Sequence, residues 1–305
     1  MSISIKKITV PSSDGTHNLA GVIYIPQGEI EGIFHIVHGM TENMGRYPRI
    51  MKDLAEIGYL CVGFDCLGHG HTAKDKKELG FFADKKGWDF LLRDIKVFAD
   101  AIKKEYGADL PYYLMGHSMG SFIARLSTEK YFQPDKLIIM GTGGPNVLAG
   151  AGLAIIALNK VFYGPRHFSR FIDRLVFSNY KRKRDDPNKK GTWLTTNLEE
   201  RKKYWSDDIG SFKFTNSAMG DLIKLMKYSN REAWFKKIPN DIPILLLSGD
   251  EDPVGKYGMG IIDINERLLR NGKDSKYILY KGARHEILND FSYDEVIKDI
   301  IEFIK

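Results

Sequence analysis

The sequence has few cysteines and no long run of apolar residues. Its two cysteines, Cys61 and Cys66, are too few for a disulfide scaffold and form no CxxC-type pair that would suggest a metal site. The longest apolar stretch, Val147 to Leu158, ends at Asn159-Lys160, whereas a membrane-spanning helix needs about 20 such residues. Residues 1–10 alternate apolar and polar side chains and lack the apolar segment of a signal peptide. These absences predict a protein of a reducing compartment, and we expect it in the cytoplasm.

The composition is that of a folded globular protein with a large core. Of the 305 residues, 43% are hydrophobic and 28% are charged, which excludes a disordered, collagen-like or coiled-coil chain. Short apolar runs alternate with helical patterns along most of the sequence. The pattern predicts strands at 3–10, 19–25, 33–37, 60–64, 112–115, 137–140, 242–247 and 277–280. It predicts helices at 47–57, 88–106, 119–131, 259–270 and 293–304.

The alternation of strands and helices stops between about 143 and 235 and then resumes. Alternating strands and helices favour a parallel sheet covered on both faces, so the fold class is α/β. The interrupted region shows helical patches and no clear strand. We therefore expect one core, residues 1–142 and 236–305, which is split in sequence by a helical insertion at 143–235.

The clearest chemical motif is Gly116-His-Ser-Met-Gly120, a G-x-S-x-G pattern. In this pattern a sharp strand-to-helix turn lifts the serine hydroxyl above the sheet edge, and the flanking glycines provide room for the turn. An apolar run precedes the motif and a helical pattern follows it, as this interpretation requires. The alternative is an ordinary serine in a glycine-rich turn. We expect Ser118 to be a nucleophile.

A serine nucleophile needs a general base, which a third group must hold in place. With this motif the acid and the histidine follow the serine in chain order, and only His167 and His285 do so. His285 follows a predicted strand and would lie at the carboxyl edge of the sheet, where active sites gather. Asp252 precedes Pro253 after another strand and is the favoured orienter. Asp250 is the alternative, although it is better placed to bond the turn's own backbone.

Acyl transfer also needs N–H donors for the charge that develops on the carbonyl oxygen. The backbone N–H of Met119 follows the nucleophile at a helix N-terminus, where the helix dipole favours an anion. The loop after the third strand begins His38-Gly39-Met40, and the N–H of Met40 is the expected second donor.

Together these segments resemble the α/β-hydrolase superfamily, and within it the monoacylglycerol lipase and lysophospholipase group. The resemblance is carried by residues 38–42, 45–47, 64–70, 116–120, 249–253 and 282–285, which follow the family's order. The sequence departs from many relatives at Leu67, where an arginine is common, and at Ser121, where a second glycine is common. Neither departure involves Ser118, Asp252 or His285.

The resemblance implies a mostly parallel sheet of about eight strands and a helical cap, the insertion, that covers the active site. It implies hydrolysis of a single-chain acyl ester, a monoacylglycerol or a lysophospholipid, without a metal or other cofactor. His38, Gly39 and His117 become candidates for substrate contact. The apolar run from Val147 would be either a mobile lid helix that meets substrate or bilayer, or a helix packed firmly on the core.

Other enzymatic activities and a non-catalytic role compete with this prediction. A prolyl-type aminopeptidase, or another amidase or thioesterase, would share the core, but an aminopeptidase needs acids in its cap. Residues 145–232 instead hold 17 Lys and Arg against 9 Asp and Glu, while the remainder holds 28 against 30. A non-catalytic scaffold on a hydrolase fold would usually have lost a catalytic residue.

Two weaker sequence patterns, one suggesting a metal site and the other a nucleic-acid site, are better explained by structural roles. Asp65, His69 and His71 lack the spacing of a zinc site. The basic segment Lys181–Arg184 with Lys189-Lys190 has no interleaved aromatics, so nucleic acid is not an expected partner. The basic cap instead points to anionic amphiphiles and to peripheral contact with their membranes.

Overall fold

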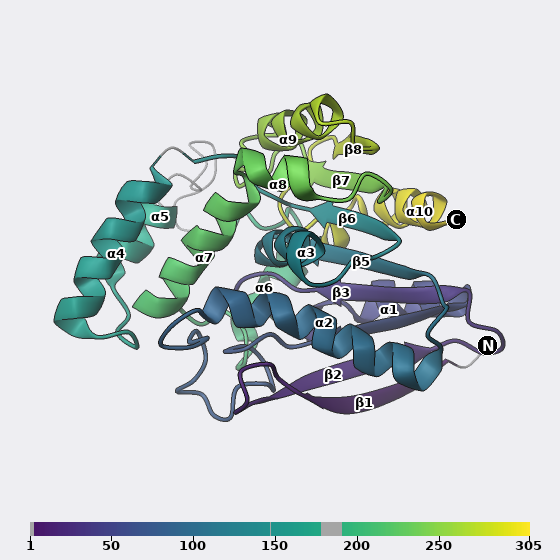
Figure 1. Cartoon of the computed structure of the whole chain (residues 1–305), viewed down its shortest axis with the longest axis horizontal. Helices are drawn as coiled ribbons and strands as arrows, with labels where there is room; N and C mark the ends of the chain where they lie inside the picture. The colour runs from purple at the N-terminus through teal and green to yellow at the C-terminus, as the bar shows by residue number, and fades with distance from the viewer. Residues whose placement is uncertain (1–2, 147, 178–190) are drawn as a thin grey trace.

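The computed structural model describes residues 3–146, 148–177 and 191–305, and within them eight strands form one sheet (Figure 1). The order across the sheet is β1-β2-β4-β3-β5-β6-β7-β8. The strands are β1 (Ser4–Pro11), β2 (Asn18–Ile25), β3 (Gly32–Val37), β4 (Tyr59–Phe64), β5 (Tyr112–His117), β6 (Lys136–Met140), β7 (Ile244–Gly249) and β8 (Ser275–Tyr280). The pairs β1–β2 and β2–β4 are antiparallel, and every later pair is parallel.

The central strands are apolar because both of their faces are covered. All residues of β3, β4, β5 and β7 are buried, which is typical of parallel strands between two helix layers. One layer contains α2 (Gly87–Tyr106), α3 (Met119–Lys130) and α9 (Met259–Arg270). The other contains α1 (Pro48–Glu56) and α10 (Tyr293–Ile304). The predicted α/β fold with a mostly parallel sheet is confirmed.

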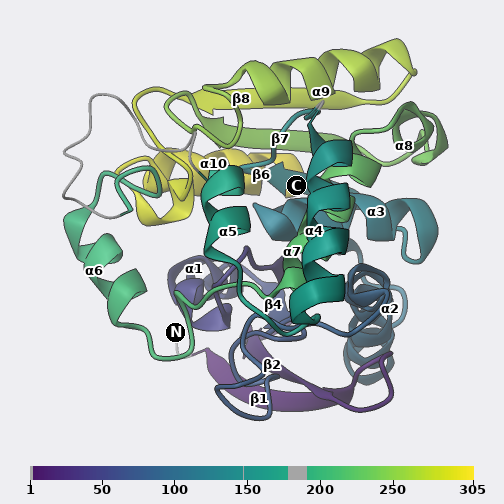
Figure 2. The ribbon, with the colours of Figure 1, turned by 90° about the vertical axis from the view of Figure 1, so that its left-hand side faces the viewer.

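Five helices lie between β6 and β7 within the described residues. They are α4 (Ala149–Tyr163), α5 (Arg170–Phe177), α6 (Leu198–Ser206), α7 (Asn216–Ser229) and α8 (Glu232–Lys237). The predicted helical insertion between two late strands is therefore confirmed. Because β6 ends at Met140 and β7 begins at Ile244, the insertion is taken from here on as residues 141–243 and no longer as the predicted 143–235. Its α7 packs on α3, and α4 packs on α7 at one end of the molecule (Figures 1 and 2). That 143–235 is a separate cap domain remains a prediction.

The predicted element boundaries are close to the observed ones, and the start of β7 differs for a physical reason. The strand predicted at 242–247 begins at Ile244. Pro243 has no N–H for the sheet ladder, and it instead accepts a hydrogen bond from the Leu137 N–H through its carbonyl oxygen. Among the described helices, none combines the length and apolarity that crossing a bilayer would demand.

Candidate active site

Ser118 stands at the turn between β5 and α3, where the backbone takes a strained conformation. Its φ of 53° is uncommon for a residue with a side chain, and such outliers persist only where the surroundings enforce them. The Ser118 N–H bonds the Met140 carbonyl oxygen at 2.9 Å, and its own carbonyl oxygen accepts from Ser121. This turn has the strand–turn–helix form predicted for a nucleophile.

The turn is possible because the two flanking positions carry no side chain. A Cβ at Gly120 would lie 2.1 Å from the carbonyl oxygen of Val37, and one at Gly116 would lie 2.3 Å from that of Gly120. Contacts under 3.0 Å are essentially never made by real Cβ atoms. The two glycines therefore let α3 approach β3 closely enough for the loops after β3 and β5 to meet.

His285 lies in the loop after β8 and reaches the Ser118 hydroxyl. Its Nε2 is 2.8 Å from Ser118 Oγ, and its side chain is almost fully buried. Two rings lie next to its imidazole, with centroids 5.3 Å away in Trp193 and 4.9 Å away in His117. The structure thus brings together Ser118 and His285, which are separated by 167 positions in the chain.

Asp252, in the loop after β7, faces the other nitrogen of this histidine. Asp252 Oδ2 is 2.9 Å from His285 Nδ1, and the carboxylate is completely buried. Its Oδ1 accepts the Val254 N–H at 2.8 Å, and Ser248 Oγ lies 3.3 Å from Oδ2. These bonds fix the carboxylate in one orientation, in which it can hold an imidazole by Nδ1.

Asp250, the alternative orienter, has a different partner. Its Oδ1 accepts the Gly282 N–H at 2.6 Å, so it joins the loop after β7 to the loop that carries His285. We expected Asp250 to bond its own turn, and the structure shows that it bonds the neighbouring loop instead. The geometry thus favours Asp252, and not Asp250, as the group that orients His285.

The loop after β3 passes directly beside Ser118. A Cβ at Gly39 would lie 3.1 Å from Ser118 Cβ, which shows how closely the two loops approach. Met40 and Met119 both line the same cavity as Ser118. The Met119 N–H is at the first position of α3, where unpaired N–H groups and the helix dipole favour an anion. The two predicted oxyanion donors therefore belong to segments that flank the serine hydroxyl.

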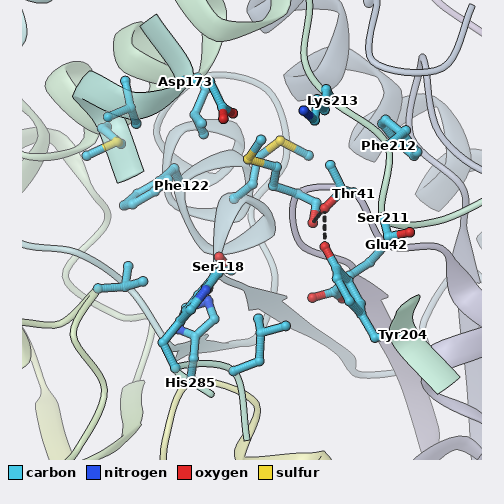
Figure 3. Close-up of a pocket in the computed structure, with 18 of the residues that line it drawn as sticks. Thr41, Glu42, Ser118, Phe122, Asp173, Tyr204, Ser211, Phe212, Lys213 and His285 are labelled. Carbon is cyan, nitrogen blue, oxygen red and sulfur yellow. Dashed lines mark hydrogen bonds between the residues drawn. The ribbon is translucent and has the colours of Figure 1, made fainter. Parts of the chain in front are cut away.

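A largely apolar cavity of about 260 Å³ opens above Ser118 and His285 (Figure 3). The core contributes Phe122 and Val254, and the insertion contributes a larger set of apolar residues. This set consists of Val176, Trp193, Leu194, Tyr204, Trp205, Phe212, Leu222 and Met226. Asp173 and Lys213 lie at the far end from the serine (Figure 3). The insertion aromatics Trp193, Tyr204, Trp205 and Phe212 are thus part of the cavity wall, whereas Phe214 packs against His69 and Phe82.

His38 and Gly39 do not line this cavity, although the sequence made both candidates for substrate contact. Both nitrogens of His38 are occupied, because Nε2 accepts the Cys66 N–H at 2.9 Å and Nδ1 donates to the Gly39 carbonyl oxygen at 2.8 Å. The histidine therefore ties the loop after β3 to the loop after β4. In this structure His38 fixes the backbone of the loop that carries Met40 and does not contact the cavity.

His117, the third candidate, is also directed away from the cavity. Its Nε2 lies 3.2 Å from the carbonyl oxygen of His285, and its Nδ1 lies 3.1 Å from the Tyr47 hydroxyl. The Tyr47 proton is donated to Glu42 at 2.6 Å, so both nitrogens of His117 face acceptors. Burial alone would lower the pKa of His117, but the nearby Glu42 carboxylate outweighs it and raises that pKa. His117 thus supports the backbone of His285 through its Nε2.

A buried ion pair beside this cluster was not anticipated from the sequence. Arg46 bonds Glu286, the residue after His285, and its side chain is 7% exposed against 2% for Glu286. Burial raises the pKa of Glu286, and the Arg46 guanidinium opposes that shift. Arg46 also lies 3.8 Å from Glu200 of α6. Its position in the Gly-Arg-Tyr segment was the available signal, but its partners are distant in sequence.

The residues considered for metal or nucleic acid have other positions. Asp65 accepts the backbone N–H groups of Met44 and His71, each at 2.8 Å, and so shapes the loop after β4. Across the described ranges, no group of three or more His, Cys, Asp or Glu side chains is placed to hold a metal ion. The segment Lys181–Arg184 and Lys189-Lys190 lies outside the described residues.

Comparison with known proteins agrees with this architecture. The family model Hydrolase_4, described as serine aminopeptidase S33, matches residues 28–292. Monoglyceride lipases of Mus musculus and Homo sapiens are 31% and 30% identical over 101 and 124 residues, which are 33% and 41% of this chain. These matches span only 31% and 38% of the two lipases.

A solved structure covers nearly the whole molecule. A highly thermostable carboxyl esterase from Bacillus coagulans, in complex with glycerol, is 28% identical with a TM-score of 0.92. The match covers 99% of this chain and 98% of the esterase. Because the family model spans most of the sequence and the fold agrees, the chain belongs to the serine aminopeptidase S33 family of α/β-hydrolases.

Proposed function

We propose that this protein is a serine carboxylester hydrolase that cleaves a single-chain acyl ester, a monoacylglycerol or a lysophospholipid. The observation that carries the proposal is the hydrogen-bonded series Ser118–His285–Asp252 at the floor of an apolar cavity. The similarity to monoglyceride lipases and to a carboxyl esterase supports the substrate class. The protein would act as a soluble enzyme of the cytoplasm that works at lipid surfaces.

In the proposed mechanism, His285 Nε2 takes the Ser118 proton while Oγ attacks the ester carbonyl. Asp252 keeps Nδ1 protonated and stabilises the imidazolium that forms. The N–H groups of Met40 and Met119 hold the oxyanion. The alcohol then leaves with the proton from His285, and water hydrolyses the acyl-enzyme by the same steps in reverse. Every step uses side chains and backbone groups of this chain.

The apolar cavity is the proposed binding site for the acyl chain. Each buried methylene contributes about 0.8 kcal/mol, so kcat/KM should rise roughly fourfold per methylene until the cavity is full. Rates across p-nitrophenyl esters of graded chain length measure this rise, and monoacylglycerol and lysophosphatidylcholine tested beside them identify the head group. A rate independent of chain length would argue against an acyl site here.

Ser118→Ala tests the nucleophile directly. It should abolish hydrolysis of a p-nitrophenyl ester and labelling by a fluorophosphonate, with an unchanged circular dichroism spectrum. The expected loss is at least 10³-fold, because the oxyanion donors and the binding site stay intact and give only residual catalysis. Substantial remaining turnover would refute the assignment of Ser118.

A prolyl-type aminopeptidase is the alternative, and it merits a test because the chain belongs to the serine aminopeptidase S33 family. Such an enzyme holds a substrate ammonium with carboxylates. The cavity contains Asp173, but Lys213 also lines it, and Glu42 is engaged by Tyr47 and His117. Proline anilides assayed beside acyl esters separate the two activities, and faster anilide cleavage would favour the peptidase.

We also propose that the outer side of α4 and α5 meets an anionic lipid surface. Val161 and Phe162 of α4 and Phe171 of α5 are 80%, 76% and 63% exposed, and the exposed Arg170 and Arg174 of α5 add positive charge. Exposed apolar groups beside basic ones suit the interface of an anionic membrane. Sedimentation with phosphatidylserine vesicles should exceed that with phosphatidylcholine vesicles and weaken in salt. Equal binding to both would remove this part of the proposal.

A further inference from the structure

Thr41, the residue after the proposed oxyanion donor Met40, has an unusual backbone conformation. Its φ is 57°, in the left-handed region that favours glycine. For a β-branched residue this is a true outlier, which persists only where surrounding contacts enforce it. Because Thr41 adjoins Met40, its conformation sets the direction of the loop that carries the Met40 N–H.

Two of the contacts that hold Thr41 come from the insertion. The Tyr204 hydroxyl of α6 lies 2.6 Å from Thr41 Oγ1 (Figure 3), and the Ser211 N–H bonds the Thr41 carbonyl oxygen at 3.0 Å. The third contact comes from the core, where the Thr41 N–H lies 3.2 Å from His69 Nε2. The N–H, the carbonyl oxygen and the hydroxyl of Thr41 are thus all engaged, and the last two of these bond residues of the insertion.

The direction of the hydrogen bonds can be assigned. Thr41 Oγ1 donates its single proton to the Met40 carbonyl oxygen at 2.7 Å. The Tyr204 hydroxyl must therefore donate to Thr41 Oγ1, which gives a chain from Tyr204 through Thr41 to the Met40 carbonyl. Hydrogen bonds in such a chain strengthen one another. Nearby, Asn43 Nδ2 donates to Asp207 Oδ2 at 2.7 Å, so a second side chain of this loop is also tied to the insertion.

We propose that Tyr204 is a positioning residue for the oxyanion site: with the Ser211 N–H, it holds Thr41 left-handed and thereby aims the Met40 N–H at the reacting carbonyl. The inference rests on the proposed esterase function. It means that the oxyanion site is complete only when α6 and the segment after it lie on the loop that follows β3. Tyr204 acts through Thr41 and not through the substrate, although its ring lines the cavity.

The test is a double-mutant cycle with p-nitrophenyl butyrate. Tyr204→Phe removes one hydroxyl and should lower kcat by about 3- to 10-fold, the effect of one lost hydrogen bond. KM should change by less than about twofold, because the loss falls on the transition state. Labelling of Ser118 by a fluorophosphonate, whose oxygen would occupy the oxyanion site, should slow by a similar factor. Thermal unfolding of the variant should stay close to that of the wild type.

The second single variant of the cycle, Thr41→Gly, tests whether Tyr204 acts through Thr41. Glycine adopts this conformation without strain and lacks the hydroxyl that Tyr204 bonds. In the Thr41→Gly background, Tyr204→Phe should therefore cause no further loss. Tyr228→Phe, at the end of α7 and outside the cavity, is the matched control and should leave kcat unchanged.

The outcomes separate this inference from the function on which it rests. The positioning role would be overturned if Tyr204→Phe lowered kcat by the same factor in the wild-type and Thr41→Gly backgrounds. It would also be overturned if Tyr204→Phe changed KM alone. An unchanged kcat in Tyr204→Phe would do the same. Absence of esterase activity in the wild type, or its survival in Ser118→Ala, would instead refute the proposed function.

Discussion

Replacing Asp252 by asparagine should disable the proposed catalytic base while preserving its position. The Val254 N–H bonds Oδ1, so the carbonyl oxygen of the new amide is held at that position. The amide NH2 then faces His285 Nδ1 in place of Oδ2. Two donors cannot face each other, and His285 must move its proton from Nδ1 to Nε2. In that tautomer Nε2 points an N–H at Ser118 and cannot accept the serine proton.

The size of the effect follows from the tautomer change. The wrong tautomer is expected to lower kcat by roughly 10⁴-fold, which corresponds to about 5.4 kcal/mol of transition-state stabilisation. Global stability should change little, because an amide replaces a carboxylate of the same shape. The assay is kcat/KM on p-nitrophenyl butyrate, with thermal unfolding followed in parallel.

Asp250→Asn is the matched control. Its carbonyl oxygen can still accept the Gly282 N–H, so the loop stays in place and kcat/KM should fall by less than about tenfold. If Asp252→Asn keeps more than a few per cent of the activity, or if Asp250→Asn is the more damaging change, then the orientation of His285 by Asp252 is wrong.

Two further predictions concern stability. Burial lowers the pKa of His35 to about 3, so the folded state stays neutral while the unfolded state gains a proton below pH 6.5. His35 alone should therefore lower the free energy of unfolding by about 2 kcal/mol between pH 7 and pH 5. When that free energy is measured by urea unfolding at both pH values, its fall should be about 2 kcal/mol smaller in His35→Phe than in the wild type, and an equal fall would contradict this. Arg46→Ala leaves Glu286 buried without its cation and should cost about 3 to 5 kcal/mol. The solvent-exposed pair of Arg49 and Asp294 is the control, and Arg49→Ala should cost less than about 1 kcal/mol by thermal unfolding.

Local features of the fold could be predicted because local physics determines them. Apolar runs identified the buried strands, and the helix predicted at 293–304 has the observed bounds of α10. The G-x-S-x-G motif located the Ser118 turn because the close approach of Gly120 to Val37 leaves no room for a side chain. The order of motifs also indicated Asp252 and His285, whose side chains the structure brings together with Ser118.

Partners that are distant in sequence could not be predicted. The family resemblance made His38 and His117 candidates for substrate contact, yet their nitrogens bond other loops of the protein and not the cavity. Arg46 with Glu286, and Tyr204 with Thr41, join segments whose proximity depends on the tertiary fold. A motif reports which loop a residue occupies, whereas the direction of its side chain depends on contacts with other loops.

The insertion between β6 and β7 also has a consequence for how the chain folds. The β6–β7 ladder pairs Leu137 with Ile244, so the sheet cannot grow past β6 until a long loop has closed. Closing a loop of roughly 100 residues costs about 2 kcal/mol more in chain entropy than closing a loop of about 10 residues, and this cost precedes the β6–β7 pairing. Until then β6, whose Leu137–Met140 are apolar and buried in the native fold, is an unpaired edge. Folding should therefore be slow at this step, and the intermediate should aggregate through β6.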